Sequence, residues 1–374
     1  MSQPLPLLPD DDANAPNAEA TLPCALDLDH DGLARALADL GQPAYRARQV
    51  FRALHQRLIR DWTDATDLPG PLRADLAARY RILSGELVVQ ATSSDGTRKR
   101  LVRLADGQEI ETVAIPATSP EGARRTSVCV STQAGCAMAC TFCATGLMGL
   151  ARNLTAGEIV DQVYGFGREG AESRPTHVVF MGMGEPLANY AATVRALRLL
   201  AHSDGLNISQ RRITVSTSGL VPQIAQLADE DLEITLAISL HAPDDATRAE
   251  LMPINRRYPL AELIPAAAAY AEKTGRRVSY EYILLSGVND TPAHAEALVE
   301  LLPARLSHVN LIPYNATDAQ YRATPPELAR ALRDRLQDGG LSATIRASRG
   351  RDIAAACGQL KAVNRRHVTT ATTA

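Results

Sequence analysis

The chain has 374 residues and a mass of 40.1 kDa, enough for one large domain with a smaller accessory unit. Charged residues make up 22% of it and the formal net charge is -3, so the chain as a whole is not a polycation, and any contact with nucleic acid must come from local basic surface. No uncharged apolar stretch is long enough to span a bilayer and the start lacks the pattern of a signal peptide, so we expect a cytoplasmic protein with no membrane contact.

The N-terminal part divides into a tail and a helical unit. Residues 1–22 mix Pro, Asp, Ala and Asn with little to bury, which predicts a disordered tail. Residues 23–85 have helical periodicity and are predicted to form an accessory domain. Within 44–60 the apolar side chains share one helix face, and five arginines occupy other positions with no acid between them: Arg46, Arg48, Arg52, Arg57 and Arg60. These arginines could hold RNA phosphates or form an ordinary solvated surface, and the sequence leaves both open.

Residues 86–125 change to short apolar runs that are typical of strands. The runs are separated by Asp95-Gly96 and Asp106-Gly107, dipeptides that favour tight hairpin turns. We therefore predict a small β-meander, followed by a polar linker, between the helical unit and the rest of the chain.

From residue 126 to 347 predicted strands alternate with predicted helices, and residues 348–374 follow as a loop with a frayed tail. The candidate strands are 127–132, 177–181, 212–216, 234–239, 278–284, 308–312 and 342–347, and the helical patterns between them include 155–168, 190–201, 260–272, 292–302 and 325–337. Alternation at this spacing predicts an α/β fold with a parallel sheet and right-handed crossovers. Functional groups in such folds gather at the carboxyl ends of the strands.

One short loop carries three cysteines, Cys136, Cys140 and Cys143, in the pattern C-x3-C-x2-C between Gly135 and Gly146. A zinc site normally has a fourth protein ligand, and no further Cys or His lies close by in the sequence. Three thiolates on a [4Fe-4S] cluster would leave one iron open. The spacing, with an aromatic residue before the third Cys, resembles the signature of radical S-adenosylmethionine (SAM) enzymes. The alternative is three buried thiols that act as small apolar side chains.

Four polar clusters follow successive predicted strands. Their members are Gly184, Glu185, Ser216, Ser239, Leu240, His241 and Asn315. Glycine lets the backbone approach a ligand closely, and a carboxylate accepts an ammonium group. Singly each cluster is more often a strand cap, but together they predict a cofactor pocket, with SAM as the ligand implied by the resemblance.

Three further cysteines stand outside this loop, of which Cys24 is interpreted as an incidental thiol. Cys129 lies near the end of the first predicted barrel strand, and Cys357 lies in a late loop downstream of several arginines. A thiol in such a setting can act as a nucleophile, and it can equally be a buried structural group.

The combined motifs resemble one family closely. They are Cys129-x6-Cys136-x3-Cys140-x2-Cys143, Met148-Gly149-x2-Arg152-Asn153-Leu154-Thr155, Gly182-Met183-Gly184-Glu185-Pro186, Ser239-Leu240-His241-Ala242, Gly287-Val288-Asn289-Asp290 and Ala356-Cys357-Gly358-Gln359-Leu360. This combination is similar to the RlmN/Cfr family of radical SAM methyltransferases, which methylate adenosine in large-subunit rRNA. The resemblance runs from about residue 41 to 360. It implies a partial (β/α)6 barrel with an N-terminal helical accessory domain, a [4Fe-4S] cluster and two SAM molecules per turnover.

The resemblance also implies residue roles. Cys357 carries a methyl group from one SAM, and a radical from the second SAM converts it to a methylene radical that adds to adenine. Cys129 then resolves the covalent RNA intermediate through a transient Cys129–Cys357 disulfide. Glu111 corresponds to the family's proton acceptor, and its neighbour Glu109 is the local alternative.

The expected product is 2-methyladenosine, in 23S rRNA near the peptidyl transferase centre and in a subset of tRNAs next to the anticodon. The expected partners are these RNAs and a reducing electron donor such as flavodoxin, with the enzyme a monomer and the Arg-rich helix as the candidate RNA surface. One alternative is the C8-methylating Cfr branch of the same family. The alternative from another class is a non-catalytic iron-sulfur RNA-binding protein.

Overall fold

The computed structural model describes residues 22–361 except 119–121, 171–172 and 318. The predicted disordered tail lies outside the described residues apart from Leu22, and the predicted frayed end after Lys361 lies outside them as well. Within the described part of the chain, no helix combines the length and apolar character needed to cross a membrane.

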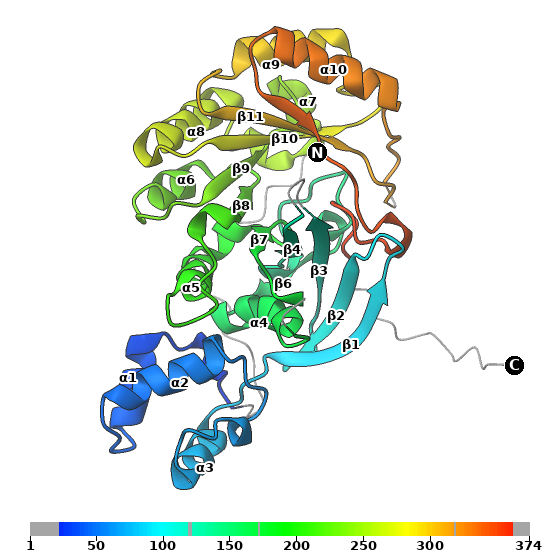
Figure 1. Ribbon diagram of the computed structural model, residues 1–374. Coiled ribbons are helices and arrows are strands. Elements are labelled where there is room, and N and C mark those ends of the chain that lie inside the picture. The colour runs from blue at the N-terminus through cyan, green and yellow to red at the C-terminus, as the bar shows by residue number, and fades with distance from the viewer. Residues whose placement is uncertain (1–21, 119–121, 171–172, 318, 362–374) are drawn as a thin grey trace, which may run out of the picture.

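The accessory unit contains α1 (His30–Ala38), α2 (Tyr45–His55) and α3 (Gly70–Arg79). The Asp29 carboxylate caps α1 by accepting a hydrogen bond from the Gly32 amide at 2.8 Å. Val50, Phe51 and Leu54 of α2 are fully buried, as the periodicity predicts. These helices lie below the barrel in the view of Figure 1.

The predicted meander is part of the main sheet. It consists of β1 (Gly85–Thr92), β2 (Arg98–Leu104) and β3 (Glu109–Thr118), joined antiparallel. β3 also pairs antiparallel with β4 (Arg124–Cys129), so the meander extends the barrel sheet instead of standing apart from it. The stretch between β3 and β4 is the one that the sequence pattern assigned to a polar linker.

The remaining strands run parallel from β4 onward. They are β7 (His177–Phe180), β8 (Ile213–Thr217), β9 (Thr235–Ser239), β10 (Val278–Leu284), β11 (Ser307–Pro313) and β12 (Ala343–Ile345). The sheet order runs from β1 to β12 without closing among the described residues, so the barrel is partial. The predicted α/β fold class is confirmed.

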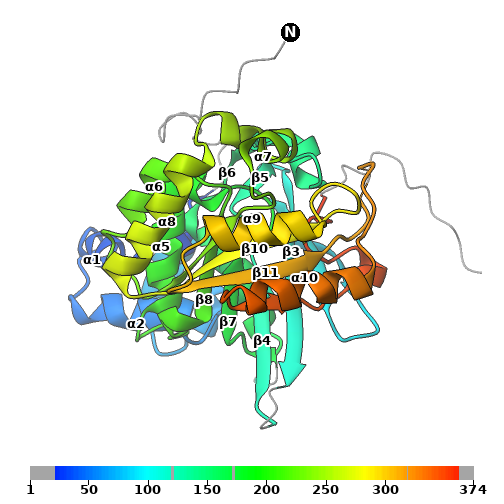
Figure 2. The same ribbon diagram turned by 90° about the horizontal axis from the view of Figure 1, so that it is seen from above.

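Helices cover the outer face of the curved sheet (Figures 1 and 2). They are α4 (Ala156–Gly167), α5 (Tyr190–Ala201), α6 (Val221–Leu227), α8 (Leu260–Thr274), α9 (Pro292–Leu301) and α10 (Pro326–Asp338). A further helix, α7 (Asp245–Leu251), lies near the carboxyl ends of β8 and β9, beside the hairpin of the cysteine loop (Figure 2). The sequence analysis did not identify α6 or α7, which have only seven residues each. Two turns of helix offer too few positions for a periodic pattern.

Two smaller features complete the fold. The three-cysteine loop connects the strands of a separate hairpin, β5 (Gln133–Cys136) and β6 (Gly149–Asn153). After β12 the chain returns to the β1–β2 hairpin, and Figure 1 shows this segment, in red, beside those strands. There the Gly350 amide donates to the Asp95 carboxylate at 3.0 Å and the Lys99 ammonium donates to the Ala354 carbonyl at 3.1 Å.

Candidate functional site

The three loop cysteines line one cavity of about 160 Å³ at the carboxyl ends of the central strands. Cys136 ends β5, and Cys140 and Cys143 follow in the loop. A side chain at Gly146 would bring its Cβ within 2.8 Å of the Cys140 carbonyl oxygen, so the loop can close only around glycine. The Thr141 amide donates to the Leu251 carbonyl at 3.0 Å, which fixes the loop to the end of α7.

The donor set fits an iron-sulfur cluster. Burial raises the pKa of Cys136 to about 12 and that of Cys140 well above its usual value, so a metal is needed to hold these sulfurs as thiolates. No group of three or more His, Cys, Asp or Glu side chains in the described residues is arranged around a single metal ion. In a [4Fe-4S] cluster each thiolate binds a different iron, so its ligands need not converge on one point.

The opposite wall of this cavity contains Gly184, Glu185, Ser216, Ser239 and His241, five of the seven residues predicted to bind SAM. They follow or end β7, β8 and β9, which is where the parallel sheet was expected to place them. The structure therefore brings the predicted cluster loop and most of the predicted SAM residues to one place.

Glu185 lies deep in this wall. Its Oε1 accepts a hydrogen bond from the Leu187 amide at 3.0 Å, and its Oε2 accepts one from the Ser218 amide at 2.7 Å. Burial raises the pKa of the carboxyl although these hydrogen bonds favour the charged form. A bound ammonium group would favour the carboxylate further. Gly184, at φ +100°, is required here because a Cβ would lie 2.6 Å from the Gln133 side chain.

His241 presents a neutral imidazole to the cavity. Its Nδ1 accepts a hydrogen bond from the Ile283 amide at 3.0 Å, which leaves the proton on Nε2. Burial, with a smaller effect of Arg248, lowers its pKa to about 3. Phe142, the aromatic residue before the third cysteine, meets this ring edge-on at 4.8 Å between centroids.

The other two predicted SAM residues do not line this cavity. Leu240 is fully buried in the core. Asn315 lines a neighbouring cavity of about 220 Å³, where its amide nitrogen donates to the Cys357 carbonyl at 3.4 Å. Its Oδ1 is buried without a hydrogen-bond partner in the described residues.

Cys357 lines both cavities, and Cys129 lines the second. Burial first, and then the charge of Cys357, raises the pKa of Cys129 to about 12. The Cys357 charge, with that of Glu281, also raises the pKa of Arg346. All six cysteines of the chain are free thiols in this structure. Cys129 and Cys357 thus share one cavity without being bonded.

Glu111 is buried on β3 but does not line either cavity. Its Oε1 pairs with the Lys99 ammonium at 2.8 Å and its Oε2 accepts from the Lys361 amide at 2.8 Å. Since Lys99 also donates to the Ala354 carbonyl, Glu111 is tied to the loop that carries Cys357. Glu109 instead pairs with Arg103 at 2.9 Å at the surface.

Arg248 of α7 was missed by the sequence analysis. It is fully buried and donates to the carbonyls of Leu240 at 3.1 Å, Ser218 at 2.8 Å and Ser239 at 3.0 Å, and to Asn255 Oδ1 at 2.6 Å. It therefore holds together the ends of β8 and β9 behind the cavity. An isolated Arg in a short helix gives no sequence signal for this role.

Glu281 was also missed. It lines the first cavity from β10, accepts from Asn310 at 2.9 Å and lies 3.8 Å from Arg346. The sequence signal for this role is one acidic residue among the mostly apolar and aromatic residues of the strand.

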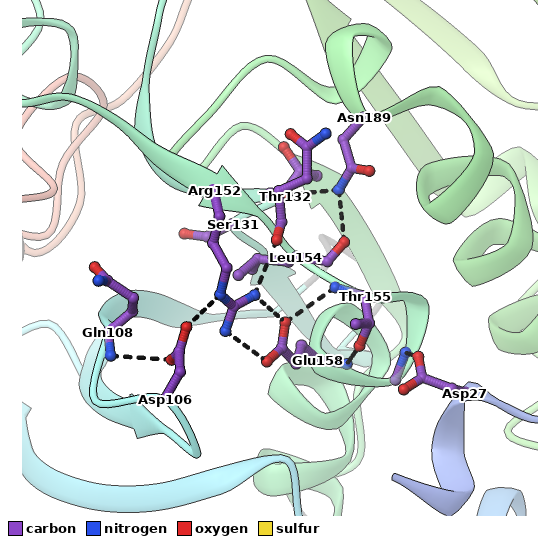
Figure 3. Close-up of polar contacts among 12 residues, drawn as sticks. Asp27, Asp106, Gln108, Ser131, Thr132, Arg152, Leu154, Thr155, Glu158 and Asn189 are labelled. Carbon is purple, nitrogen blue, oxygen red and sulfur yellow. Dashed lines mark hydrogen bonds and ion pairs between the residues drawn. The ribbon is translucent and has the colours of Figure 1, made fainter. Parts of the chain in front are cut away.

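Arg152 anchors the hairpin that carries the cysteine loop (Figure 3). From β6 it makes a two-pronged ion pair with Glu158, at 2.8 and 2.9 Å, and it also contacts Asp106 of the β2–β3 turn. Glu158 Oε2 in turn accepts from the Thr155 amide at 2.9 Å and caps α4. Asp27 accepts from the Gly157 amide at 2.6 Å, so the same helix end also contacts the accessory unit.

Two family models match the chain. Residues 130–302 match the Radical SAM superfamily, and residues 25–82 match the ribosomal RNA large subunit methyltransferase N-terminal domain. The first match contains the cysteine loop, and the second contains the accessory helices.

Individual proteins are similar over most of the chain. A probable dual-specificity RNA methyltransferase RlmN from Symbiobacterium thermophilum is 49% identical, with 88% of each chain covered. The dual-specificity RNA methyltransferase RlmN from Anaeromyxobacter dehalogenans is 49% identical over 90% of this chain and 91% of its own. The crystal structure of a radical SAM methyltransferase from Sphaerobacter thermophilus has a TM-score of 0.87 and 50% identity, covering 91% of this chain and 99% of that one.

Proposed function

This chain belongs to the RlmN family of radical SAM RNA methyltransferases, and on that premise we propose that it converts adenosine to 2-methyladenosine in 23S rRNA and in a subset of tRNAs. The proposed positions are near the peptidyl transferase centre and next to the anticodon. The names of the relatives, which describe dual specificity for RNA, support two substrate classes.

One observation carries the proposal: Cys357 faces two spaces at once. It lines the cavity that contains the three loop cysteines, and it lines the cavity that contains Cys129. A sulfur whose methyl group first loses a hydrogen atom to a radical, and which is later attacked by a second thiol, needs access to both groups. This position supports Cys357 as the methyl carrier and Cys129 as the resolving thiol.

The family implies a [4Fe-4S] cluster and SAM. We propose Cys136, Cys140 and Cys143 as the cluster ligands, with Gly184, Glu185, Ser216, Ser239 and His241 around SAM. When bound, the cluster supplies the single electron that cleaves SAM. Leu240 and Asn315 enter the proposal differently, Leu240 as a backbone acceptor for Arg248 and Asn315 as a side chain that positions Cys357.

Release of the product requires a thiolate at Cys129. Its attack forms a sulfur-sulfur bond with Cys357 and breaks the bond between the Cys357 sulfur and the carbon attached to adenine. That carbon leaves with the bonding electron pair and takes up a proton, which completes the methyl group. We propose Glu111 as the proton acceptor for the adenine ring. Its ion pair with Lys99 supports a charged carboxylate next to the Cys357 loop, and substrate binding would have to replace its contact with the Lys361 amide.

The proposed organisation is an accessory domain at residues 23–85, the meander and linker at 86–125, the barrel at 126–347 and the loop with Cys357 from 348. The family matches at 25–82 and 130–302 support the accessory domain and the barrel. We further propose that the enzyme works as a monomer and receives electrons from a low-potential donor such as flavodoxin.

The test is mass spectrometry of nucleosides from 23S rRNA and tRNA after anaerobic incubation of the cluster-loaded protein with SAM and a reductant. We expect 2-methyladenosine in both RNAs and none with Cys357→Ala. Cys24→Ala is the matched control, because Cys24 is a buried thiol whose hydrogen bond goes to the Ile82 carbonyl, away from both cavities. This control should keep its activity.

Other products would decide between the alternatives. 8-Methyladenosine would assign the chain to the C8-methylating branch. SAM cleavage without any methylated adenosine would show that the RNA assignment is wrong. Equal activity of the Cys357→Ala variant would refute the role of Cys357.

A further inference from the structure

Three of the five arginines in residues 44–60 have acidic partners. Arg48 and Arg52 of α2 share one carboxylate, Asp204, at 2.9 and 2.6 Å, and Arg57 pairs with Asp67 at 2.6 Å. Arg46 donates to the Gln49 side-chain oxygen at 2.6 Å. A phosphate that binds Arg48, Arg52 or Arg57 would have to compete with these carboxylates, so the surface that the sequence favoured for RNA is partly neutralised within the protein itself.

A second set of arginines lines the cavity of the thiol pair and a nearby surface groove, and no carboxylate of the described residues pairs with them. Arg125 and Arg349 line the cavity of Cys129 and Cys357. Arg174 and Arg212 line a surface groove of about 500 Å³. We call these four residues the arginine track. No acidic residue lines either hollow in the part of the chain that the structure describes.

The individual contacts agree with this picture. The Arg125 guanidinium donates to the Ser127 hydroxyl at 3.2 Å, and none of the four track residues makes an ion pair with a carboxylate of the described residues. The other cation at the inner cavity, Arg346, has Glu281 at 3.8 Å. Among the residues that the structure describes, no carboxylate balances the positive charge of the track.

Arginine side chains line both the cavity and the groove. The two hollows lie on the two faces of the start of β4, where Arg125 and Ser127 point to the cavity and Thr126 points to the groove. Burial and then the nearby charges of Arg212 and Arg346 lower the pKa of Arg125. Burial, Arg125 and Arg212 together lower the pKa of His177 to about 4. Arg125 and Arg212 are therefore close enough to repel each other across the edge between the hollows.

Like charges that are kept together without an acid destabilise the folded protein, so their position favours an anionic ligand. The ligand must be extended, because the track runs from an outer groove to an inner cavity. A single-stranded nucleic acid has one phosphate per nucleotide and fits a line of separate cations.

We propose that the arginine track binds the phosphates next to the target adenosine, so that the RNA strand enters through the groove of Arg174 and Arg212 and passes Arg125 to reach the thiol pair. This inference rests on the proposed RNA substrate and assigns its strand path. Adenosine must leave its helix to meet Cys357, and phosphate contacts on one side of it would hold the strand in that unstacked form.

The test compares two matched double variants, Arg174→Gln with Arg212→Gln and Arg48→Gln with Arg52→Gln. Each removes two exposed or partly exposed arginine charges. The probe is a fluorescently labelled, unmodified tRNA transcript, and anisotropy gives its affinity at several KCl concentrations. The slope of log affinity against log salt should fall by about 1.4 in the track variant, about 0.7 for each lost single-strand phosphate contact, and should change little in the α2 variant.

A second measurement places the contact in the RNA. Replacing the phosphates on either side of the target adenosine, one at a time, by neutral methylphosphonates should weaken binding to the wild-type protein. At the phosphate that the arginine track contacts, the same replacement should weaken RNA binding by the track variant little further. Iron content and SAM cleavage without RNA should be unchanged in both variants, which shows that the barrel is intact.

The outcomes separate the two proposals. If the wild-type protein methylates the RNA but the track variant keeps the wild-type slope, the strand path is wrong and the proposed function stands. If the α2 variant loses as much slope as expected for the track, the RNA contact lies on the accessory helix instead. If the wild-type protein neither binds nor methylates the RNA, both proposals fall.

Discussion

Replacing Arg152 by Met should destabilise the protein strongly. The substitution keeps much of the side-chain volume but removes both contacts to Glu158, whose side chain is only 4% exposed. The carboxylate would keep the Thr155 amide as a partner and lose the cation that compensates its charge. Breaking a buried ion pair in this way costs about 3–5 kcal/mol, a large part of a typical stability of about 5–15 kcal/mol.

The measurement is urea unfolding of the metal-free protein, followed by far-UV circular dichroism and by the fluorescence of Trp62, the only tryptophan. Circular dichroism reports the whole chain and Trp62 reports the accessory unit, so coincident curves would support a two-state analysis. Arg211→Met is the matched control, because Arg211 pairs with Glu233 at 3.0 Å with both side chains more than half exposed. It should cost less than about 1 kcal/mol.

A third variant tests the cause. In Arg152→Met with Glu158→Leu, the buried charge of Glu158 is gone and only Asp106, whose side chain is 19% exposed, has lost its cation. About half of the lost stability should therefore return even though the cap of α4 is lost. The reasoning is refuted if Arg152→Met costs no more than the Arg211→Met control, or if the double variant is less stable than the single one.

Three further substitutions test other parts of the structure. Arg248→Met should reduce the iron bound per chain and the affinity for SAM measured by calorimetry, because the Ser218 and Ser239 carbonyls lose their donor. Unchanged iron content and SAM affinity would contradict a positioning role for Arg248. Gly146→Ala should also lower the iron content, whereas Gly70→Ala, where a Cβ meets nothing closer than 4.0 Å, should not. Burial lowers the pKa of His55 to about 3, so below about pH 6.5 only the unfolded chain takes up its proton. Between pH 7 and pH 5 the unfolding free energy should therefore fall by about 2 kcal/mol more in the wild type than in His55→Gln, and parallel pH profiles would refute this.

Strongly patterned elements could be predicted from the sequence almost to the residue. β10 (Val278–Leu284) and α5 (Tyr190–Ala201) have the predicted bounds, because each has enough residues to display its period. The hairpin β5–β6 could not be found in this way, since its strands have only four and five residues and depend on tertiary contacts. The joining of the meander to β4 is a long-range pairing that local patterns do not encode.

The same distinction applies to the candidate site. The cysteine loop could be identified because its three cysteines are neighbours in the sequence. Arg248 acts through carbonyls from two other strands, and nothing near it in the chain indicates those partners. The partners of Glu111 lie on β2 and near residue 361, so its role had to come from the family resemblance. Asn315 was assigned to the SAM pocket because it follows a strand, but its side chain turns toward Cys357.

The attachment of the Cys357 loop has a consequence for the order of synthesis. The loop is held by Asp95 and Lys99 of the β1–β2 hairpin, so the second cavity is built from segments made early and late during translation. A nascent chain that has emerged only as far as β12 contains the three-thiol loop and the strands of the barrel. It does not yet contain Cys357, which shares the second cavity with Cys129. The proposed reaction on RNA would therefore begin only after this last segment has folded back onto the first strands, and a chain truncated before residue 350 would lack the proposed methyl carrier.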